Sequence, residues 1–135
     1  MLRPDDFQKS QLVLVSWRYG QEYGGYLPAL MIMNCIANRV KGGWGTWLDV
    51  INRIPYFSAQ IEQPTGFPQI WQPDFTRLLH EVEGVYSNAA NDLSKGGLYW
   101  ADLRRVDNSW FRDHILKFPE IHPRIVESNS LAIFK

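Results

Sequence analysis

Apolar residues recur at helical spacing in three long stretches of the chain, and this pattern predicts a helix in each. The first is expected over residues 8–19, where four consecutive apolar residues, Leu12 to Val15, indicate burial on nearly all sides. A β-strand is the alternative for so short a run. The second is expected over residues 27–40 and has apolar residues on two faces, which predicts a central position. The third is expected over residues 73–90, with a single apolar face.

Turn-forming and capping residues separate these helices. Gly20, Gly24 and Gly25 are expected to end the first helix and to build the loop that leads into the second. Thr46 is suited to cap a short helix that continues to Ile54.

The second half of the chain adds smaller elements. Residues 59–72 form a loop rich in Gln, Pro and Gly, and loops of this length often bind ligands. A short helix is expected from Ser109 to Phe118, and strands near 98–101 and 131–134 are expected to pair. The sequence therefore predicts one domain over residues 1–135, with a mainly α (α+β) fold and a small two-stranded sheet near the C-terminus.

Aromatic residues are more abundant than a small core requires. The chain of 135 residues contains six Trp, six Tyr and seven Phe. Flat ring faces stack on sugar rings, while the polar edges of Tyr and Trp bond hydroxyls. Some of these rings are therefore expected to line a groove.

Charge and hydropathy narrow the range of partners. The formal net charge is zero and no run of Lys or Arg exists, so neither nucleic acid nor an anionic membrane is expected as a partner. The apolar runs are too short to span a membrane, so no membrane insertion is expected. The polar start of the chain has no signal-peptide pattern, which favours synthesis in the cytoplasm.

No metal and no organic cofactor is expected. The three histidines, His80, His114 and His122, lie far apart and have no metal-like partner at helical spacing. The one cysteine, Cys35, lies inside an apolar helical run and is interpreted as a small buried hydrophobe rather than a reactive thiol.

The candidate catalytic residue is Glu22, which follows the first buried helix and is surrounded by Trp17, Tyr19, Tyr23 and Tyr26. An apolar wall disfavours a carboxylate and raises its pKa, which suits a general acid for cleavage of a glycosidic bond. Most glycosidases need a second carboxylate, and the sequence leaves four candidates open: Asp49, Glu62, Asp92 and Asp102. A solvated loop glutamate is the alternative interpretation.

Several segments follow one another in an order that a known family shares. They are Trp17 before Glu22, Asn38-Arg39-Val40 at a helix end, Ile54-Pro55-Tyr56-Phe57-Ser58, the run from Asp92 to Trp100, Trp110-Phe111 and Ile133-Phe134. In this order the chain resembles the SleB-type cell wall hydrolases, the family of spore-cortex-lytic and related peptidoglycan-cleaving enzymes. The resemblance extends from Leu12 to Phe134. The family has two glutamates in the turn that follows the first helix. In this chain Tyr19 occupies the position of the first glutamate, and Glu22 lies one residue before the position of the second.

The resemblance implies a lysozyme-like fold and lytic transglycosylase or muramidase chemistry on the glycan strands of peptidoglycan. We expect Glu22 to be the proton donor. The residues expected to contact the substrate are Trp17, Tyr19, Tyr23, Asn38, Phe57, Tyr99 and Trp100. Since strand residues alternate between faces, only one of Tyr99 and Trp100 is expected to face a ligand.

Two residues at the end of the second helix have more than one interpretation. Asn38 either bonds a sugar N-acetyl group or fixes the loop after the helix by bonding backbone groups. Arg39 is expected to form a structural ion pair.

Two other functions remain open. One is a non-catalytic virion structural or wall-binding protein that keeps the lysozyme-like fold, and the other is a chitinase-like glycosidase on the same scaffold. An enzyme made in the cytoplasm would reach the wall through phage lysis machinery or as a virion component, with other virion proteins as partners.

Overall fold

A computed structural model describes residues 3–22, 25–54, 72–87, 92–102 and 131–134 of the chain. The elements in order are α1 (Asp6–Glu22), α2 (Tyr26–Lys41), α3 (Trp47–Asn52), α5 (Gln72–Ser87), β1 (Tyr99–Asp102) and β2 (Leu131–Phe134). The fold is mainly helical with a small antiparallel sheet near the C-terminus, as predicted. The expected helix at 109–118 and nearly all of the loop at 59–72 lie outside the described residues.

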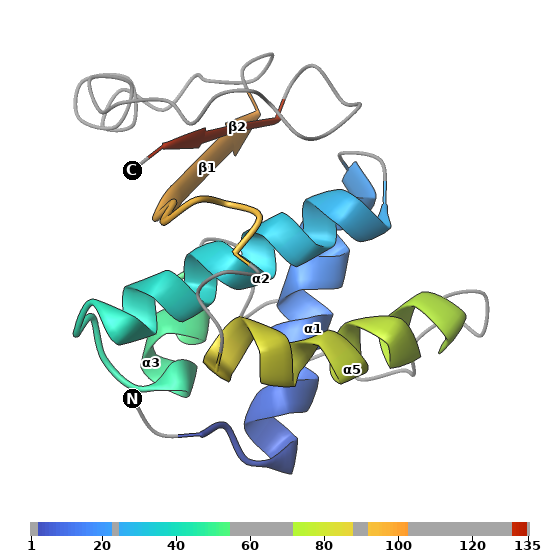
Figure 1. Cartoon of the computed structure of the whole chain (residues 1–135), viewed down its shortest axis with the longest axis horizontal. Coiled ribbons are helices and arrows are strands. Elements are labelled where there is room, and N and C mark those ends of the chain that lie inside the picture. The colour runs from blue at the N-terminus through green and yellow to red at the C-terminus, as the bar shows by residue number, and fades with distance from the viewer. Residues whose placement is uncertain (1–2, 23–24, 55–71, 88–91, 103–130, 135) are drawn as a thin grey trace.

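Helix α2 lies at the centre of the fold, as its two apolar faces predict. Every residue from Met31 to Ala37 is buried. Figure 1 shows α1 and α5 crossing on one side of α2, while the two strands lie on the other side in this view. The core is completed by side chains from every described helix and from β2, among them Leu12, Val15, Ile51, Leu78, Val82 and Ile133.

Helix α1 is longer than predicted, because Gly20 continues the helix instead of ending it. A Cβ atom at Gly20 would lie 2.5 Å from the Cβ atom of Ala29 in α2. Glycine is thus needed here because the two helices approach closely, and not because the chain turns. As a consequence, Glu22 is the last residue of α1 and is not part of a loop between two helices.

The remaining helix ends follow the sequence rules. The hydroxyl of Thr46 accepts a hydrogen bond from the Asp49 amide, and the Asp49 carboxylate accepts one from the Thr46 amide, so a capping box starts α3 as predicted. Pro28 lies in the first turn of α2, where a missing N–H costs nothing. Gly42 and Gly43 follow the end of α2, and Gly43 has a φ of 83°.

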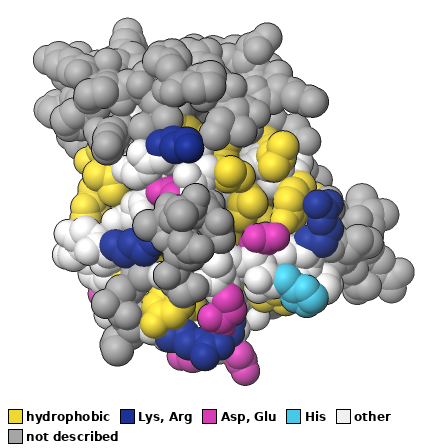
Figure 2. All heavy atoms as spheres, viewed as in Figure 1, with side chains coloured by type: hydrophobic (Ala, Val, Ile, Leu, Met, Phe, Trp, Pro, Cys, Tyr) yellow, Lys and Arg dark blue, Asp and Glu magenta, His cyan; other side chains and the backbone are white. Residues whose placement is uncertain are grey.

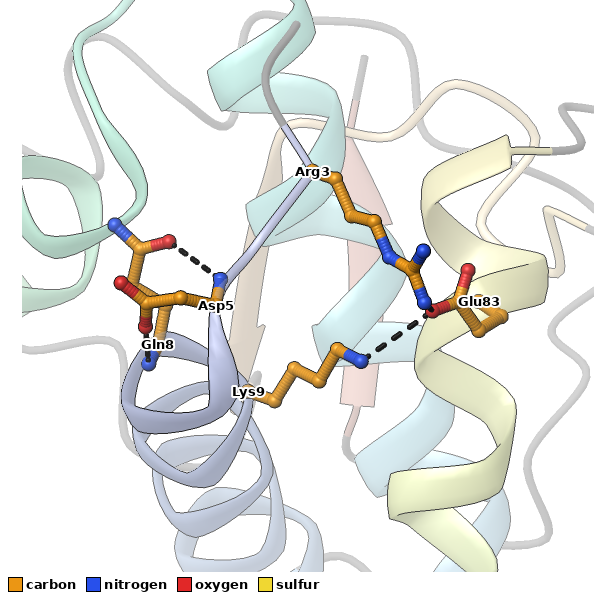
Figure 3. Close-up of polar contacts among 5 residues, drawn as sticks. All are labelled: Arg3, Asp5, Gln8, Lys9 and Glu83. Atoms are coloured by element: carbon orange, nitrogen blue, oxygen red, sulfur yellow. Dashed lines mark hydrogen bonds and ion pairs between the residues drawn. The ribbon is translucent and has the colours of Figure 1, made fainter.

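The segment before α1 is fixed to α5 (Figure 3). Arg3 and Lys9 both form ion pairs with Glu83 of α5. The Asp5 carboxylate accepts a hydrogen bond from the Gln8 amide, and the Asp5 amide donates to the Gln8 side chain. This reciprocal arrangement caps the first turn of α1.

The two strands pair as predicted, although the chain between them is long. Tyr99 lies opposite Phe134 and Asp102 lies opposite Leu131. The Leu98 amide extends the ladder by donating to the Phe134 carbonyl, at 2.9 Å.

Part of the surface is apolar. Figure 2 shows hydrophobic side chains gathered between charged ones over α2 and α5. The Arg77 guanidinium of α5 lies 3.9 Å from the centre of the Tyr26 ring of α2. In the parts of the chain that the structure describes, no helix is both long and apolar enough to cross a bilayer.

Candidate functional site

The last turn of α2 is joined to the segment that leads into β1. The side-chain nitrogen of Asn38 lies 2.9 Å from Asp92 Oδ2, 3.1 Å from Ser94 Oγ and 3.0 Å from the Gly97 carbonyl oxygen. Asn38 therefore fixes a distant segment, whereas the structural interpretation of the sequence placed its partners in the loop directly after α2. Its amide nitrogen is occupied within the protein, so only its carbonyl oxygen remains to be considered for a sugar.

Asp92 organises the turn that Asn38 contacts. Its Oδ1 accepts hydrogen bonds from the Ser94 hydroxyl at 2.6 Å and the Ser94 amide at 2.8 Å, and its Oδ2 accepts one from the Gly96 amide at 2.8 Å. Lys95 and Gly96 have φ angles of 53° and 83°, so two consecutive residues are left-handed. The carboxylate stabilises this strained turn by bonding its amides.

The hydrogen bonds outweigh the cost of burying the Asp92 charge. Partial burial acts to raise the pKa of Asp92, but the bonds from Ser94, Asn38 and Gly96 favour the carboxylate, so the pKa lies below its ordinary value. Asp92 is thus ionised and fully engaged, which makes it a poor candidate for a second catalytic carboxylate. Asp49 is also engaged, by the α3 cap.

Arg39 lies beside Asn38 and contacts three aromatic rings. Its Nε donates to the Leu98 carbonyl at 2.7 Å. Its guanidinium carbon lies 4.7 Å from the centre of the Trp100 ring, 5.0 Å from Trp44 and 5.6 Å from Tyr99. The expected ion pair is wrong for the described residues, since none of their carboxylates lies within 4 Å of Arg39. Ring faces and a carbonyl take the place of a carboxylate.

Two ring pairs extend this group. The Tyr19 ring of α1 meets Trp100 nearly edge-on, with centres 5.9 Å apart and planes at 73°. The Trp44 ring lies 5.6 Å from Tyr99. We call these five half-buried residues, Tyr19, Arg39, Trp44, Tyr99 and Trp100, the Arg39 cluster. The cluster joins α1, α2, the turn before α3 and β1.

Both Tyr99 and Trp100 belong to this cluster, although strand alternation predicted that they would differ. Each ring is half-buried, and each lies within 6 Å of Arg39. The guanidinium group lies near the start of β1, where its Nε bonds Leu98. A group at the end of a strand meets side chains from both faces, which explains why alternation does not separate the two rings.

Four of the predicted substrate-contacting residues are brought together: Tyr19, Asn38, Tyr99 and Trp100. Trp17 lies in the core and is only 6% exposed, so little of its ring is available to a ligand. Tyr23 and Phe57 lie outside the described residues, and for Glu22 only the backbone is described. Glu22 lies three positions after Tyr19, at the end of α1.

Two cluster residues, Arg39 and Trp44, were not predicted as site residues from the sequence. For Trp44 the sequence indicated no role at all. It lies in the glycine-rich turn between α2 and α3, where its position five residues after Arg39 gives no helical or strand pattern. A tryptophan in the glycine-rich turn that follows α2, close in sequence to Arg39 in the last turn of that helix, was the available signal.

Within the described segments, no group of three His, Cys, Asp or Glu side chains lies close enough together to hold a metal ion. Comparisons of the chain with protein-family models, with curated proteins and with solved structures found no match. The functional argument therefore depends on the geometry of the site and on the family resemblance.

Proposed function

We propose that this protein is a lysozyme-like enzyme of the SleB type that cleaves the glycan strand of peptidoglycan, with Glu22 as proton donor. The observation that supports this most is the contact between Tyr19 and Trp100. It places the last turn of α1, which contains Glu22, beside the aromatic residues of β1. In this proposal, the helix turn that contains the acid and a surface for stacking sugars are then neighbours.

The position of Glu22 in α1 suits an acid. Backbone carbonyls at the C-terminal end of a helix carry partial negative charge, which disfavours a carboxylate there and favours the neutral carboxyl. A neutral carboxyl can donate its proton to the glycosidic oxygen as the bond to the anomeric carbon breaks. Glu22 is the last residue of α1, so it lies at this end.

One carboxyl is sufficient for a lytic transglycosylase. After Glu22 protonates the leaving oxygen, a hydroxyl of the same sugar attacks the anomeric carbon and gives its proton back to the Glu22 carboxylate. The product carries an anhydro end, and no water is consumed. This route agrees with the engagement of Asp49 and Asp92 in structural hydrogen bonds. A hydrolase would instead need a second free carboxylate.

The Arg39 cluster supplies the sugar-binding surface in this proposal. Tyr99, Trp100 and Trp44 are half-buried, so each residue is partly open to solvent. Aromatic faces bind sugars through their C–H groups while hydroxyls bond polar edges. The carbonyl oxygen of Asn38 can accept a hydrogen bond from an N-acetyl N–H group.

A second function, a virion structural or wall-binding protein without catalysis, is favoured by Tyr19. The residue at the position of the first family glutamate packs against Trp100. That position therefore has a packing role in this chain. For either function, the route to the wall would be phage lysis machinery or assembly into a virion.

The test compares the wild-type protein with Glu22→Gln on purified peptidoglycan, both intact and after an amidase has removed the stem peptides. Gln keeps the shape of the side chain but has no proton to donate, so release of soluble fragments should slow roughly 10²–10⁴-fold. Mass spectrometry of the fragments should show anhydro-muramyl ends rather than reducing ends. If the wild-type protein releases nothing, the non-catalytic function is correct. If Glu22→Gln is as active as wild type, another residue is the acid.

A further inference from the structure

Arg39 has hydrogen-bond donors that the protein does not use. Its Nε is bonded to the Leu98 carbonyl, but neither terminal nitrogen forms a hydrogen bond or an ion pair in the described part of the chain. Arg39 is half-buried, so the residue is not closed off from solvent. The terminal N–H groups are thus available to a ligand.

The surroundings of Arg39 favour an anion. Burial of the guanidinium lowers the pKa of Arg39, although the group stays charged at neutral pH because its ordinary pKa is so high. A positive charge that is partly withdrawn from water is stabilised by a negative partner. Ring faces supply only part of that stabilisation. The planar pair of terminal N–H donors matches the two oxygens of a carboxylate.

The rings around Arg39 indicate which kind of molecule carries the anion. The three ring centres lie 4.7 to 5.6 Å from the guanidinium carbon. A carboxylate on Arg39 would therefore be flanked by aromatic faces that bind sugar rings. A small inorganic anion would bind Arg39 and leave these ring faces uncovered. An acidic sugar would bind Arg39 through its carboxylate and cover the ring faces with its sugar ring.

We propose that the Arg39 cluster is a binding site for a carboxylate attached to a sugar, and that this carboxylate is the lactyl group of N-acetylmuramic acid. This proposal rests on the proposed function for its choice of sugar. The lactyl group is a free carboxylate only where the stem peptide has been removed. The site would then select peptide-free glycan strands, so a reaction that hydrolyses the amide bond to the peptide must supply its substrate. The stem peptide also has carboxylates, and one of these is the other group that could bind Arg39 in the same way.

Binding can be measured on the wild-type protein by NMR of the indole N–H signals of Trp44 and Trp100. N-acetylmuramic acid and N-acetylglucosamine differ in the lactyl group, so the first should shift these two signals at a much lower concentration than the second. A third probe is N-acetylmuramyl-alanyl-isoglutamine, whose lactyl carboxylate is an amide and whose free carboxylate lies on the peptide. Shifts with this probe alone would assign the carboxylate to the peptide. Equal shifts with the first two sugars, or none with any probe, would overturn the proposal.

A matched pair of variants tests the role of the guanidinium. Arg39→Gln removes charge-assisted hydrogen bonds and should weaken binding of N-acetylmuramic acid roughly 10- to 100-fold. Arg39→Lys keeps the charge but not the paired donors, so its affinity for N-acetylmuramic acid should lie between those of wild type and Arg39→Gln. Arg77→Gln, which removes a ring-stacked arginine from α5, is the control and should bind as wild type does. Unchanged binding by folded Arg39→Gln would refute the site. If Arg39→Gln does not fold, the comparison of the sugars still decides.

Binding and cleavage can be separated. Glu22→Gln should bind N-acetylmuramic acid as tightly as wild type, because the carboxyl acts on the glycosidic bond and not on the lactyl group. If peptidoglycan is not cleaved but the acidic sugar binds, the proposed function fails and the carboxylate site stands. If peptidoglycan is cleaved but no probe binds at the cluster, the carboxylate site fails and the proposed function stands.

Discussion

Asn38 and Asp92 are separated by 54 positions in the chain, yet the Asn38 amide nitrogen lies 2.9 Å from the Asp92 carboxylate. This bond fixes the end of the central helix α2 to the turn that begins β1. Arg39 is the next residue in α2, and Tyr99 and Trp100 follow the turn. The Asn38–Asp92 bond therefore determines where the two sides of the Arg39 cluster meet.

The stability of this connection should depend on pH. Because the pKa of Asp92 in the folded protein lies below the value of about 3.9 for an unfolded aspartate, its carboxylate contributes stability at pH values above about 4. This contribution is lost as the pH falls through the folded pKa. We expect Asp92→Asn to lower the free energy of unfolding at pH 7 by roughly 1–3 kcal/mol, since the new NH₂ group would face donors.

Urea denaturation between pH 3 and pH 7 measures this effect. The wild-type protein should lose more stability than Asp92→Asn as the pH falls below about 4. Glu81→Gln removes a negative charge from an exposed position on α5 and controls for net charge. Parallel pH profiles for wild type and Asp92→Asn would show that Asp92 does not carry the pH dependence.

Gly20→Ala should destabilise the protein, although alanine is the better residue in a helix. The new methyl group would lie within 2.6 Å of backbone atoms of Ala29, so α1 and α2 must separate. Overpacking of this kind costs roughly 1–3 kcal/mol, which should exceed the gain of about 1 kcal/mol in helix propensity. Thermal unfolding measures the difference. Ser10→Ala in the same helix provides the control, and an increase in melting temperature for Gly20→Ala would contradict the close contact.

Cys35 should resist alkylation in the folded protein. Its side chain is fully buried, and burial raises the pKa of the thiol to about 12 even though Arg39 and Ser94 act to lower it. The reactive thiolate is then almost absent at pH 8. Mass spectrometry after iodoacetamide treatment should show unmodified native protein and complete single labelling in urea, because the chain has one cysteine. Rapid labelling without denaturant would show that α2 opens.

Cleavage of peptidoglycan should become slower as the pH rises. In the proposed mechanism Glu22 must be protonated to donate, so kcat/KM should fall at high pH as the carboxyl ionises. The rate of fragment release at several pH values, with stability checked at each, measures this dependence. A rate that stays constant or rises toward pH 9 would exclude a carboxylic acid as the donor.

The helices were predictable because their signals are local. Thr46 and Asp49 cap α3 through residues three apart, and the apolar spacing of α2 and α5 reports directly which faces are buried. Gly20 was misjudged for the opposite reason. Whether a glycine ends a helix or allows another helix to approach depends on Ala29, nine positions later, and no local rule contains that contact.

The candidate site was predictable in part. The aromatic and polar residue types identified Tyr19, Tyr99 and Trp100, which lie around Arg39, and Asn38, which bonds the segment just before β1. The partner of Arg39 was not predictable, because an arginine can pair with a carboxylate or stack on ring faces, and only the fold decides which are near. Trp17 was assigned to a groove by its neighbours in sequence, but its position on α1 turns it into the core.

The pairing of β1 with β2 has a consequence for how the chain is made. Synthesis proceeds from the N-terminus, so α1, α2, α3 and α5 all leave the ribosome before residues 131–134 exist. Until then β1 has an unpaired edge, and the Leu98 amide lacks its bond to Phe134. Bringing together two strands that lie far apart in the sequence also carries an entropic cost. A nascent chain would therefore assemble its helices first and complete the aromatic surface around Arg39 last.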